Sequence, residues 1–381
     1  MKKLGIYVHI PFCRQKCKYC DFYSVKWNDE SENKYIDAVI NEINNYRDTL
    51  NEKYIVDTIY FGGGTPTVIN PGNLRRILEK IRSVFEIDVH AEINMEANPN
   101  TLTEENLKVY KETGINRLSI GIQSLNDDIL HKIGRIHNSR EALEAIDRAK
   151  QFGFENINAD VMFNIPDQTI ADIETTLSKI IEKNVKHISF YSLKLEKGTP
   201  MYDMEKNRKI IMPKEDEERE MYYAGRNVME DKNLFQYEIS NFALKGYECK
   251  HNLKYWNQEE YIGIGPSAHS FLNDIRYSNP SDLNSYCLNS EANVFERKIH
   301  EVMDQKDLIF EYIMLRLRLT EGLNVVDFKN KFLVDFYEAY LKQIEYLINN
   351  KLLEYSGDFV KLTQTGMDIS NFVFEKFMPQ N

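Results

Sequence analysis

The feature that most constrains this chain is a group of three cysteines, Cys13, Cys17 and Cys20, directly after a short apolar run at residues 4–10. The spacing C-x3-C-x2-C in one polar loop brings three thiolates close enough to hold one compact metal centre. A site closed by cysteines alone takes four of them, for zinc as for an iron–sulfur cluster. Three cysteines therefore favour a cubane iron–sulfur cluster with one iron left open to another ligand.

Two other uses of these cysteines are weaker. A disulfide is disfavoured because the chain shows no secretory signal, which indicates a reducing compartment. A structural zinc ion would need His9 or Asp21 as its fourth ligand. C-x3-C-x2-C is not a usual zinc spacing, and His9 belongs to the preceding predicted strand, so zinc stays open as the lesser alternative.

Charge and length narrow the class of protein. The chain has 381 residues and a formal net charge of -11, which argues against non-specific binding to nucleic acid or to an anionic membrane surface. No apolar run approaches the roughly 20 residues that span a bilayer. The first predicted strand begins almost at the N-terminus, which leaves no room for a targeting peptide. These features predict a cytoplasmic protein.

Short apolar runs alternate with helical patterns through the first half of the chain. The runs are nearly continuous, as is typical of parallel strands covered on both faces, and they lie at residues 4–10, 56–61, 91–96, 117–123, 156–163 and 187–193. Amphipathic helices are predicted around residues 35–46, 74–85, 142–152 and 170–181. Six strand–helix units in a row predict an α/β fold, a partial parallel (β/α)6 barrel.

Polar residues follow each of these strands where the strand ends. Because the carboxyl ends of parallel strands meet at one face of a barrel, we expect them to form one site. Taken alone, the stretch Gly62-Gly63-Gly64-Thr65-Pro66 predicts only a tight glycine turn. It lacks the Gly-Lys-Ser/Thr ending of a phosphate-binding loop. The predicted rim also contains Glu96, Asn98, Gln123, Arg135, Asp160 and Asn164.

Residues 7 to about 193 resemble the radical S-adenosylmethionine (SAM) superfamily, in the three-cysteine loop and the GGGTP motif. The resemblance implies a 4Fe–4S cluster on Cys13, Cys17 and Cys20, with its open iron chelated by the amino and carboxylate groups of SAM. It also implies an electron donor such as a flavodoxin or a ferredoxin. By motif matching, the residues expected to bind SAM are Tyr7, Tyr19, Gly63, Gly64, Thr65, Glu96, Gln123, Arg135 and Asp160.

Over nearly its full length the chain is similar to oxygen-independent coproporphyrinogen III dehydrogenase and its paralogues. Those enzymes tend to carry another cysteine two positions after the third ligand, where this chain has Phe22. They also tend to carry an N-terminal extension, whereas the first strand here begins at about Leu4. Both departures resemble the haem chaperone subfamily and put the decarboxylation reaction in doubt.

The same subfamily is marked by H-N-x-x-Y-W, which this chain carries at residues 251–256. The resemblance implies haem contacts from His251, Asn252, Tyr255 and Trp256. A neutral imidazole is a suitable axial ligand for haem iron, and the two aromatic rings offer flat faces to a porphyrin. Without the motif, His251 would be an ordinary satisfied histidine.

Two further residues are weaker candidates. Cys249 could serve as a soft ligand, but no C-x-x-C-H haem-attachment motif is present, so an incidental thiol is the simpler interpretation. His269 follows a glycine-rich turn and is a secondary candidate for contact with SAM or haem.

The pattern changes towards the C-terminus. We expect a radical SAM part-barrel with the haem-motif extension at residues 1–272, a polar linker at 273–300, and a small, mainly helical domain at 301–381. The last domain ends in a predicted hairpin around Ser356-Gly357-Asp358, which together with its helices suggests a winged helix. Its lysines are interleaved with acids, which favours packing against the barrel over binding of nucleic acid.

Three hypotheses follow, with no catalytic residue assigned. The first is a haem chaperone that passes haem cargo to an acceptor protein, for which a membrane-bound acceptor and a homodimeric carrier are both compatible with the sequence. The second is a radical enzyme of porphyrin metabolism acting on coproporphyrinogen III. The third is a winged-helix regulator with the cluster as sensor, which the acidic balance disfavours. Phe22, the short N-terminus and the motif at 251–256 favour the first.

Overall fold

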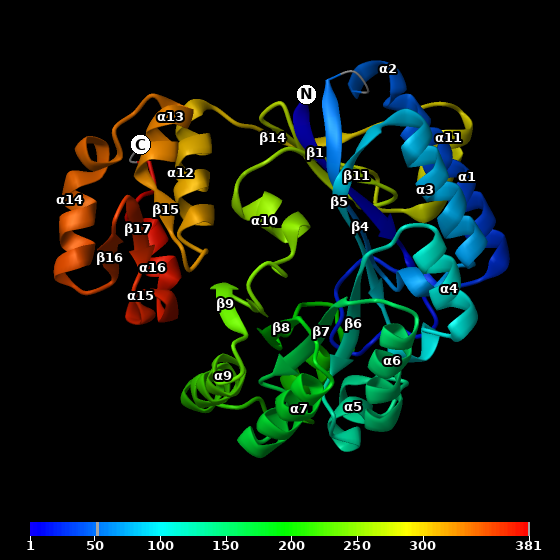
Figure 1. The fold of residues 1–381 in the computed structure, drawn as a ribbon, viewed down its shortest axis with the longest axis horizontal. Helices are drawn as coiled ribbons and strands as arrows, with labels where there is room; N and C mark the ends of the chain where they lie inside the picture. Colours follow the sequence, from blue (N-terminus) through cyan, green and yellow to red (C-terminus); the bar gives the residue numbers. More distant parts are fainter. Residues whose placement is uncertain (51–52, 380–381) are drawn as a thin grey trace.

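The core of the molecule is a curved sheet of parallel strands, in a computed structural model that describes residues 1–50 and 53–379 (Figure 1). The six predicted strands are confirmed as β1 (Lys2–Ile10), β4 (Tyr54–Gly63), β5 (Glu86–Ala97), β6 (Arg117–Gln123), β7 (Asn156–Phe163) and β8 (His187–Ser192). Each pairs in parallel with the next. The predicted partial parallel barrel is therefore confirmed.

Helices cover the outer face of this sheet. Their apolar stripes pack into one core with the strands: Leu4, Ile6 and Val8 of β1 share a buried cluster with Ile36 and Val39. The bounds of the helices up to residue 230 are α1 (Asp29–Asn45), α2 (Arg47–Leu50), α3 (Pro71–Val84), α4 (Glu104–Glu112), α5 (Asp127–Ile133), α6 (Ser139–Gln151), α7 (Ile170–Glu182), α8 (Pro200–Lys206) and α9 (Glu215–Glu230).

Local signals explain where the longer helices begin. Asn138 and Thr169 cap α6 and α7 in capping boxes with Glu141 and Asp172, which satisfy backbone N–H groups that the first turn leaves free. Pro71 occupies the first turn of α3, where its missing N–H costs nothing.

Short strands extend the sheet beyond the six at both edges. Outside β1 lie β11 (Tyr261–Ile264), parallel to it, and then the antiparallel β12 (His269–Leu272), β13 (Ile275–Ser278) and β14 (Lys298–Val302). Outside β8 lie β10 (Asn241–Ala243) and β9 (Phe235–Glu238). Within the described ranges the sheet has twelve strands in the order β14-β13-β12-β11-β1-β4-β5-β6-β7-β8-β10-β9.

Residues 273–300, which the sequence predicts to be a polar linker, form regular structure. They contain β13, α11 (Leu283–Glu291) and the start of β14. Tyr277, Leu283 and Tyr286 are buried in the same cluster as the barrel strands, and α11 packs against α1. The polar composition of this segment reflects the exposed sides of an edge strand and a surface helix. The remaining domain bounds stay a prediction.

The C-terminal part has its own apolar core, which includes Ile313, Phe328, Phe336 and Leu347. Its elements are α12 (Gln305–Arg316), β15 (Leu323–Asn324), α13 (Val325–Phe332), α14 (Phe336–Asn349), β16 (Leu353–Ser356), β17 (Phe359–Leu362), α15 (Gln364–Asp368) and α16 (Ser370–Glu375). The predicted hairpin is confirmed by β16 and β17, which β15 extends to a three-stranded sheet in the order β15-β17-β16. The helices α12, α13 and α14, followed by this hairpin, form the winged-helix-like arrangement.

A short helix, α10 (Lys250–Trp256), lies between the barrel and the C-terminal part (Figure 1). It contacts β4 on one side and α12 on the other. Gln258, just after it, donates hydrogen bonds to the Leu308 carbonyl and to Glu311, both at 3.0 Å. The helix that carries the H-N-x-x-Y-W motif is therefore held by both parts of the chain.

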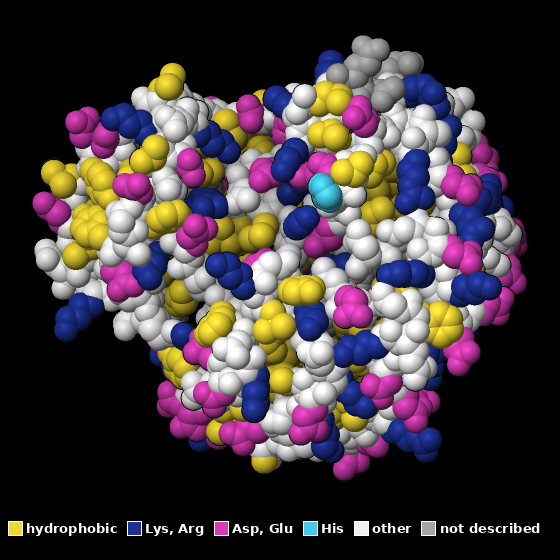
Figure 2. Space-filling view, viewed as in Figure 1, with side chains coloured by type: hydrophobic (Ala, Val, Ile, Leu, Met, Phe, Trp, Pro, Cys, Tyr) yellow, Lys and Arg dark blue, Asp and Glu magenta, His cyan; other side chains and the backbone are white. Residues whose placement is uncertain are grey.

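The surface carries both signs of charge. Lysine and arginine side chains alternate with aspartate and glutamate on the face drawn in Figure 2, and apolar side chains are visible where the C-terminal part meets the barrel. Among the helices that the structure describes, none has the length and hydrophobicity to cross a membrane.

Candidate functional site

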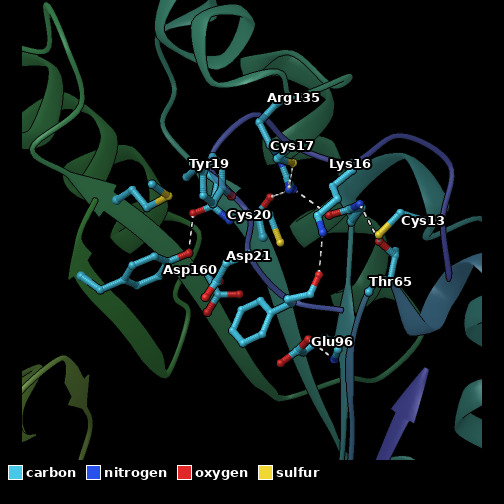
Figure 3. A pocket seen from close by; sticks show the side chains of 18 of the residues that line it. Cys13, Lys16, Cys17, Tyr19, Cys20, Asp21, Thr65, Glu96, Arg135 and Asp160 are labelled. Atoms are coloured by element: carbon cyan, nitrogen blue, oxygen red, sulfur yellow. Dashed lines mark hydrogen bonds between the residues drawn. The ribbon is translucent and has the colours of Figure 1, made fainter. Parts of the chain in front are cut away.

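A cavity of about 460 Å³ opens at the carboxyl ends of the parallel strands (Figure 3). Its volume lies within the range of roughly 300–1,000 Å³ typical of ligand pockets. Most of the predicted cluster and SAM residues line it together: Cys13, Cys17, Cys20, Tyr19, Gly63, Gly64, Thr65, Glu96, Gln123, Arg135 and Asp160. Residues that lie between Cys13 and Asp160 in the sequence thus meet in one place, as expected for the carboxyl ends of parallel strands.

The cysteine loop is irregular but anchored at both ends. The short strands β2 (Phe12–Cys13) and β3 (Val25–Lys26) pair and close its base. In the middle, the Lys18 N–H donates to the Ile133 carbonyl and the Lys18 carbonyl accepts from Met201 N–H, both at 3.0 Å. Lys16 Nζ donates to the Phe22 carbonyl at 2.8 Å within the loop. These bonds fix the path of the backbone that carries the three thiols.

Two of the sulfur atoms accept hydrogen bonds from the cavity wall. Arg135 Nη1 lies 3.5 Å from Cys17 Sγ, and the Thr65 hydroxyl lies 3.7 Å from Cys13 Sγ. A second Arg135 nitrogen, Nη2, donates to Asn98 Oδ1 at 2.7 Å, which holds the guanidinium in place. Donors to cluster sulfurs are one of the means by which proteins set cluster potentials.

The close packing at the end of β4 requires glycine at positions 63 and 64. Gly63 has φ of +107°, and a Cβ there would lie 2.5 Å from the His9 ring. A Cβ on Gly64 would lie 2.6 Å from the Phe12 carbonyl oxygen. Only glycine therefore lets β4 end directly against the start of the cysteine loop.

Two half-buried carboxyl groups, those of Glu96 and Asp160, line this cavity. Burial, followed by the nearby Asp160, raises the pKa of Glu96 to about 7. Burial also raises the pKa of Asp160, which is held by hydrogen bonds from Asn158 and Ser119. Such carboxyl groups become favourable anions once a ligand brings cationic or hydroxyl donors to them.

Gln123 lines the cavity, whereas Tyr7 lies outside it. Gln123 ends β6 with φ of +68°, uncommon for a residue other than glycine, and accepts a hydrogen bond from the Tyr191 hydroxyl at 2.8 Å. Tyr7 is not among the residues that line the cavity. Its hydroxyl bonds His9 Nδ1 at 3.0 Å, and its ring stacks on Tyr60 with centroids 6.1 Å apart.

The residues fit a 4Fe–4S cluster with bound SAM better than a zinc ion. The His9 ring uses Nδ1 for Tyr7 and Nε2 for the Tyr23 carbonyl, at 2.9 Å, so it offers no free nitrogen. The cavity offers three thiols along one wall, two carboxyl groups, and the Arg135 guanidinium, whose buried Nε has no partner among the described residues. These groups match the donors and acceptors of a cluster–SAM pair.

The H-N-x-x-Y-W motif lies outside this cavity, on α10. His251 is buried and both of its ring nitrogens are engaged: Nδ1 with the Thr58 hydroxyl at 2.8 Å and Nε2 with the Tyr255 hydroxyl at 2.9 Å. Burial, then the charge of Lys254, lowers the pKa of His251 to about 3, so its ring is neutral. In this conformation His251 is a satisfied interior histidine.

The other motif residues face different neighbours. Asn252 is half-buried, and Trp256 lies beneath the C-terminal part, with the Arg318 guanidinium 5.6 Å from its ring. The buried Trp256 Nε1 has no hydrogen-bond partner among the described residues. Lys254, between them, is anchored by Asp57 and Glu259, each at 2.8 Å.

Neither weaker candidate joins the cavity. Cys249 is buried, with its Sγ 3.5 Å from Glu92, which agrees with an incidental thiol. His269 is exposed and its ring stacks on that of His300, with centroids 5.1 Å apart.

Sequence reasoning missed the polar residues that line the inner face of the barrel. They alternate along each strand, which is the signal that could have found them, since residues two apart share a face. Hydrogen bonds link them into networks across the strands, as with Asn158, Ser119 and Ser189. The set comprises Thr58, Tyr60, Glu92, Asn94, Arg117, Ser119, Asn158, His187 and Ser189.

Two family models match this chain. The model described as "Radical SAM superfamily" matches residues 7–180, and "HemN C-terminal domain" matches residues 303–369.

Curated relatives are similar over the whole length. "Heme chaperone HemW" of Lactococcus lactis is 37% identical over 99% of this chain and 98% of its own. The proteins of the same name from Bacillus subtilis and Escherichia coli are 35% and 31% identical, covering 98% and 99% of this chain and 98% of their own. Among solved structures, coproporphyrinogen III oxidase (HemN) from Escherichia coli has a TM-score of 0.86 at 20% identity, covering 99% of this chain and 90% of that one. At that identity the match shows the fold alone.

Proposed function

This chain belongs to the family of the heme chaperone HemW proteins, within the radical SAM superfamily, and we propose on that basis that it binds haem and delivers it to an acceptor protein. The observation that carries the proposal is full-length similarity to several proteins of that one name, at 31–37% identity. Phe22 supports it, because the dehydrogenases that this chain resembles tend to have cysteine at that position.

We propose that Cys13, Cys17 and Cys20 hold the 4Fe–4S cluster and that Arg135, Glu96 and Asp160 hold SAM beside it. When bound, the cluster and SAM together supply a reducible centre next to a cleavable sulfonium. The protein orients the pair: Arg135 offers a cation for the SAM carboxylate, while Glu96 and Asp160 accept hydrogen bonds from its amine and hydroxyl groups.

The H-N-x-x-Y-W motif on α10 is the proposed haem contact, through His251, Asn252, Tyr255 and Trp256. His251 would ligate iron through Nε2, which requires the Tyr255 hydroxyl to release that nitrogen. The neutral ring is in the protonation state that an axial ligand needs.

The partners beyond haem are also proposals. The haem acceptor is a protein. If it is bound to a membrane, this chain would reach it by associating peripherally with that membrane. An electron donor of the flavodoxin or ferredoxin type would serve the cluster. We also propose that the protein is cytoplasmic and that it carries haem as a homodimer.

The alternative is a coproporphyrinogen III dehydrogenase-type enzyme. The similarity to the solved oxidase supports a shared fold, and the full-length relatives carry the other name, so this alternative has less support.

The proposal is tested by haem transfer. Cluster-reconstituted protein is loaded with haem anaerobically, freed of excess haem on a desalting column and mixed with apomyoglobin as a generic acceptor. We expect a stable Soret band on the loaded protein and a time-dependent shift to the myoglobin spectrum. Loss of all haem on the desalting column would refute the proposal.

A further inference from the structure

A continuous set of contacts joins the cavity to the H-N-x-x-Y-W helix through Tyr60 on β4. The Tyr60 hydroxyl donates to Glu96 Oε1 at 2.8 Å, and Glu96 Oε2 accepts from the Gly63 N–H at 3.3 Å. On its other side, the Tyr60 ring lies against the His251 ring, with centroids 5.2 Å apart. One side chain therefore touches both a wall of the cavity and the proposed haem ligand.

Tyr60 has little room to move independently of its neighbours. A Cβ on Gly62 would lie 2.9 Å from Tyr60 Cε1, 3.0 Å from Tyr7 Cε2 and 3.1 Å from Glu96 Oε1. The two tyrosine rings and the glutamate therefore already pack closely over this glycine. In so dense a packing, a displacement of one group is transmitted to the others.

The arrangement that orients Glu96 is also the one in which His251 is unavailable to iron. His251 Nδ1 and Nε2 are both bonded here, to Thr58 and Tyr255. Because His251 is only 1% exposed, its ring cannot meet haem iron where it lies, so coordination by Nε2 breaks the Tyr255 bond and moves the ring against which Tyr60 packs. The two arrangements are thus alternative states of one contact set, and a ligand that prefers one of them disfavours the other.

We propose that SAM and haem binding are negatively coupled through Tyr60, so that SAM bound at Glu96 weakens haem binding at His251 and promotes haem release. This inference rests on the proposed function. It gives the SAM site a regulatory role in a carrier, since binding alone, without cleavage, changes haem affinity. By linkage, haem weakens SAM binding by the same factor.

The test is a haem titration of cluster-reconstituted protein, followed by Soret absorbance without reductant, in the presence and absence of saturating SAM. We expect SAM to raise the haem Kd by about 5- to 150-fold, the usual span of coupling between two sites. Equilibrium dialysis of radiolabelled SAM should show the same factor when haem is added. Tyr60→Phe keeps the ring but loses the bond to Glu96, and should bring the factor close to one.

Tyr54→Phe is the matched control. Tyr54 lies on the same strand and also donates its hydroxyl to a glutamate, Glu260 at 3.0 Å, away from the cavity. The Tyr54→Phe protein should show the same SAM-dependent increase in the haem Kd as wild type. If Tyr60→Phe does not fold, Thr58→Val replaces it: freeing His251 Nδ1 should likewise reduce the effect of SAM.

The outcomes separate the two proposals. Saturable haem binding that ignores SAM, or a Tyr60→Phe protein that keeps the full factor, overturns the coupling alone. Absence of saturable haem binding overturns the proposed function and the coupling with it.

Discussion

Arg135 Nη1 lies 3.5 Å from Cys17 Sγ, and this pair ties the strand ends to the proposed cluster. The guanidinium is also bound by Asn98 Oδ1, so it cannot swing away from the sulfur without losing that bond. A fixed positive charge and an N–H donor beside a thiolate stabilise the reduced, more negative cluster.

Arg135→Gln should therefore lower the reduction potential of the cluster. An anaerobic redox titration of the reconstituted protein, followed by electron paramagnetic resonance, measures the midpoint. Arg140→Gln, which removes an exposed arginine on α6 that pairs with Glu144, is the control and should leave the potential unchanged. An unchanged midpoint in Arg135→Gln would contradict the role assigned to this residue.

Replacing Cys13, Cys17 or Cys20 by serine should abolish the broad visible absorbance of anaerobically prepared protein, since each change removes a thiolate ligand. Cys287→Ser is the control, because Cys287 is buried on α11 in contact with the outer core. Wild-type absorbance in the three variants would exclude the cluster from this loop.

The pKa of Glu96 makes stability depend on pH. A carboxyl whose folded-state pKa is raised, here from 4.5 to about 7, contributes stability that is fully present below its unfolded pKa and is lost as pH rises through about 7. At about 1.4 kcal/mol per pKa unit, the loss is about 3 kcal/mol. Glu96→Gln has no proton to lose at this position.

Urea unfolding of the cluster-free protein at pH 4 and pH 8 checks this. The free energy of unfolding of Glu96→Gln should match wild type at pH 4, below the unfolded pKa, and exceed it by about 3 kcal/mol at pH 8. A difference between the two proteins that does not change with pH would show that the carboxyl titrates normally.

His251→Ala should weaken haem binding by at least about tenfold, the equivalent of losing roughly 1.4 kcal/mol of ligation energy, and should change the Soret maximum. Because His251 is buried, circular dichroism must show that the variant folds. His131→Ala removes an exposed histidine on α5 and should bind haem as wild type does. Identical haem spectra for His251→Ala and wild type would rule out His251 as the ligand.

The sequence predicts the central sheet well because its strands are long, buried and apolar. It fails at the end of the sheet. There β13 and β14 are short, β14 is an exposed edge strand, and only their pairing makes them part of the sheet. That the cysteine loop and the rim residues lie together follows from the strand order, because the carboxyl ends of parallel strands meet at one face of a barrel.

The position of His251 could not be predicted in the same way. Its contact with Tyr255 is one that helix spacing allows, because residues four apart on a helix lie side by side. Its contact with Thr58 is not predictable in this way, since Thr58 lies on a strand almost 200 positions earlier. Tyr60 was inside a correctly predicted strand, yet its contacts with Glu96 and His251 depend on how two distant elements pack.

The most direct test of a haem carrier on this scaffold is a pair of anaerobic incubations. Reconstituted protein receives limiting haem without SAM in one, and SAM, a reductant and coproporphyrinogen III in the other. Gel filtration then measures the haem retained in the first, and chromatographic analysis of the porphyrins measures the products of the second. We predict haem that co-elutes with the protein and coproporphyrinogen III that is recovered unchanged. Protoporphyrinogen IX in the products, with no haem retained by the protein, would contradict the account.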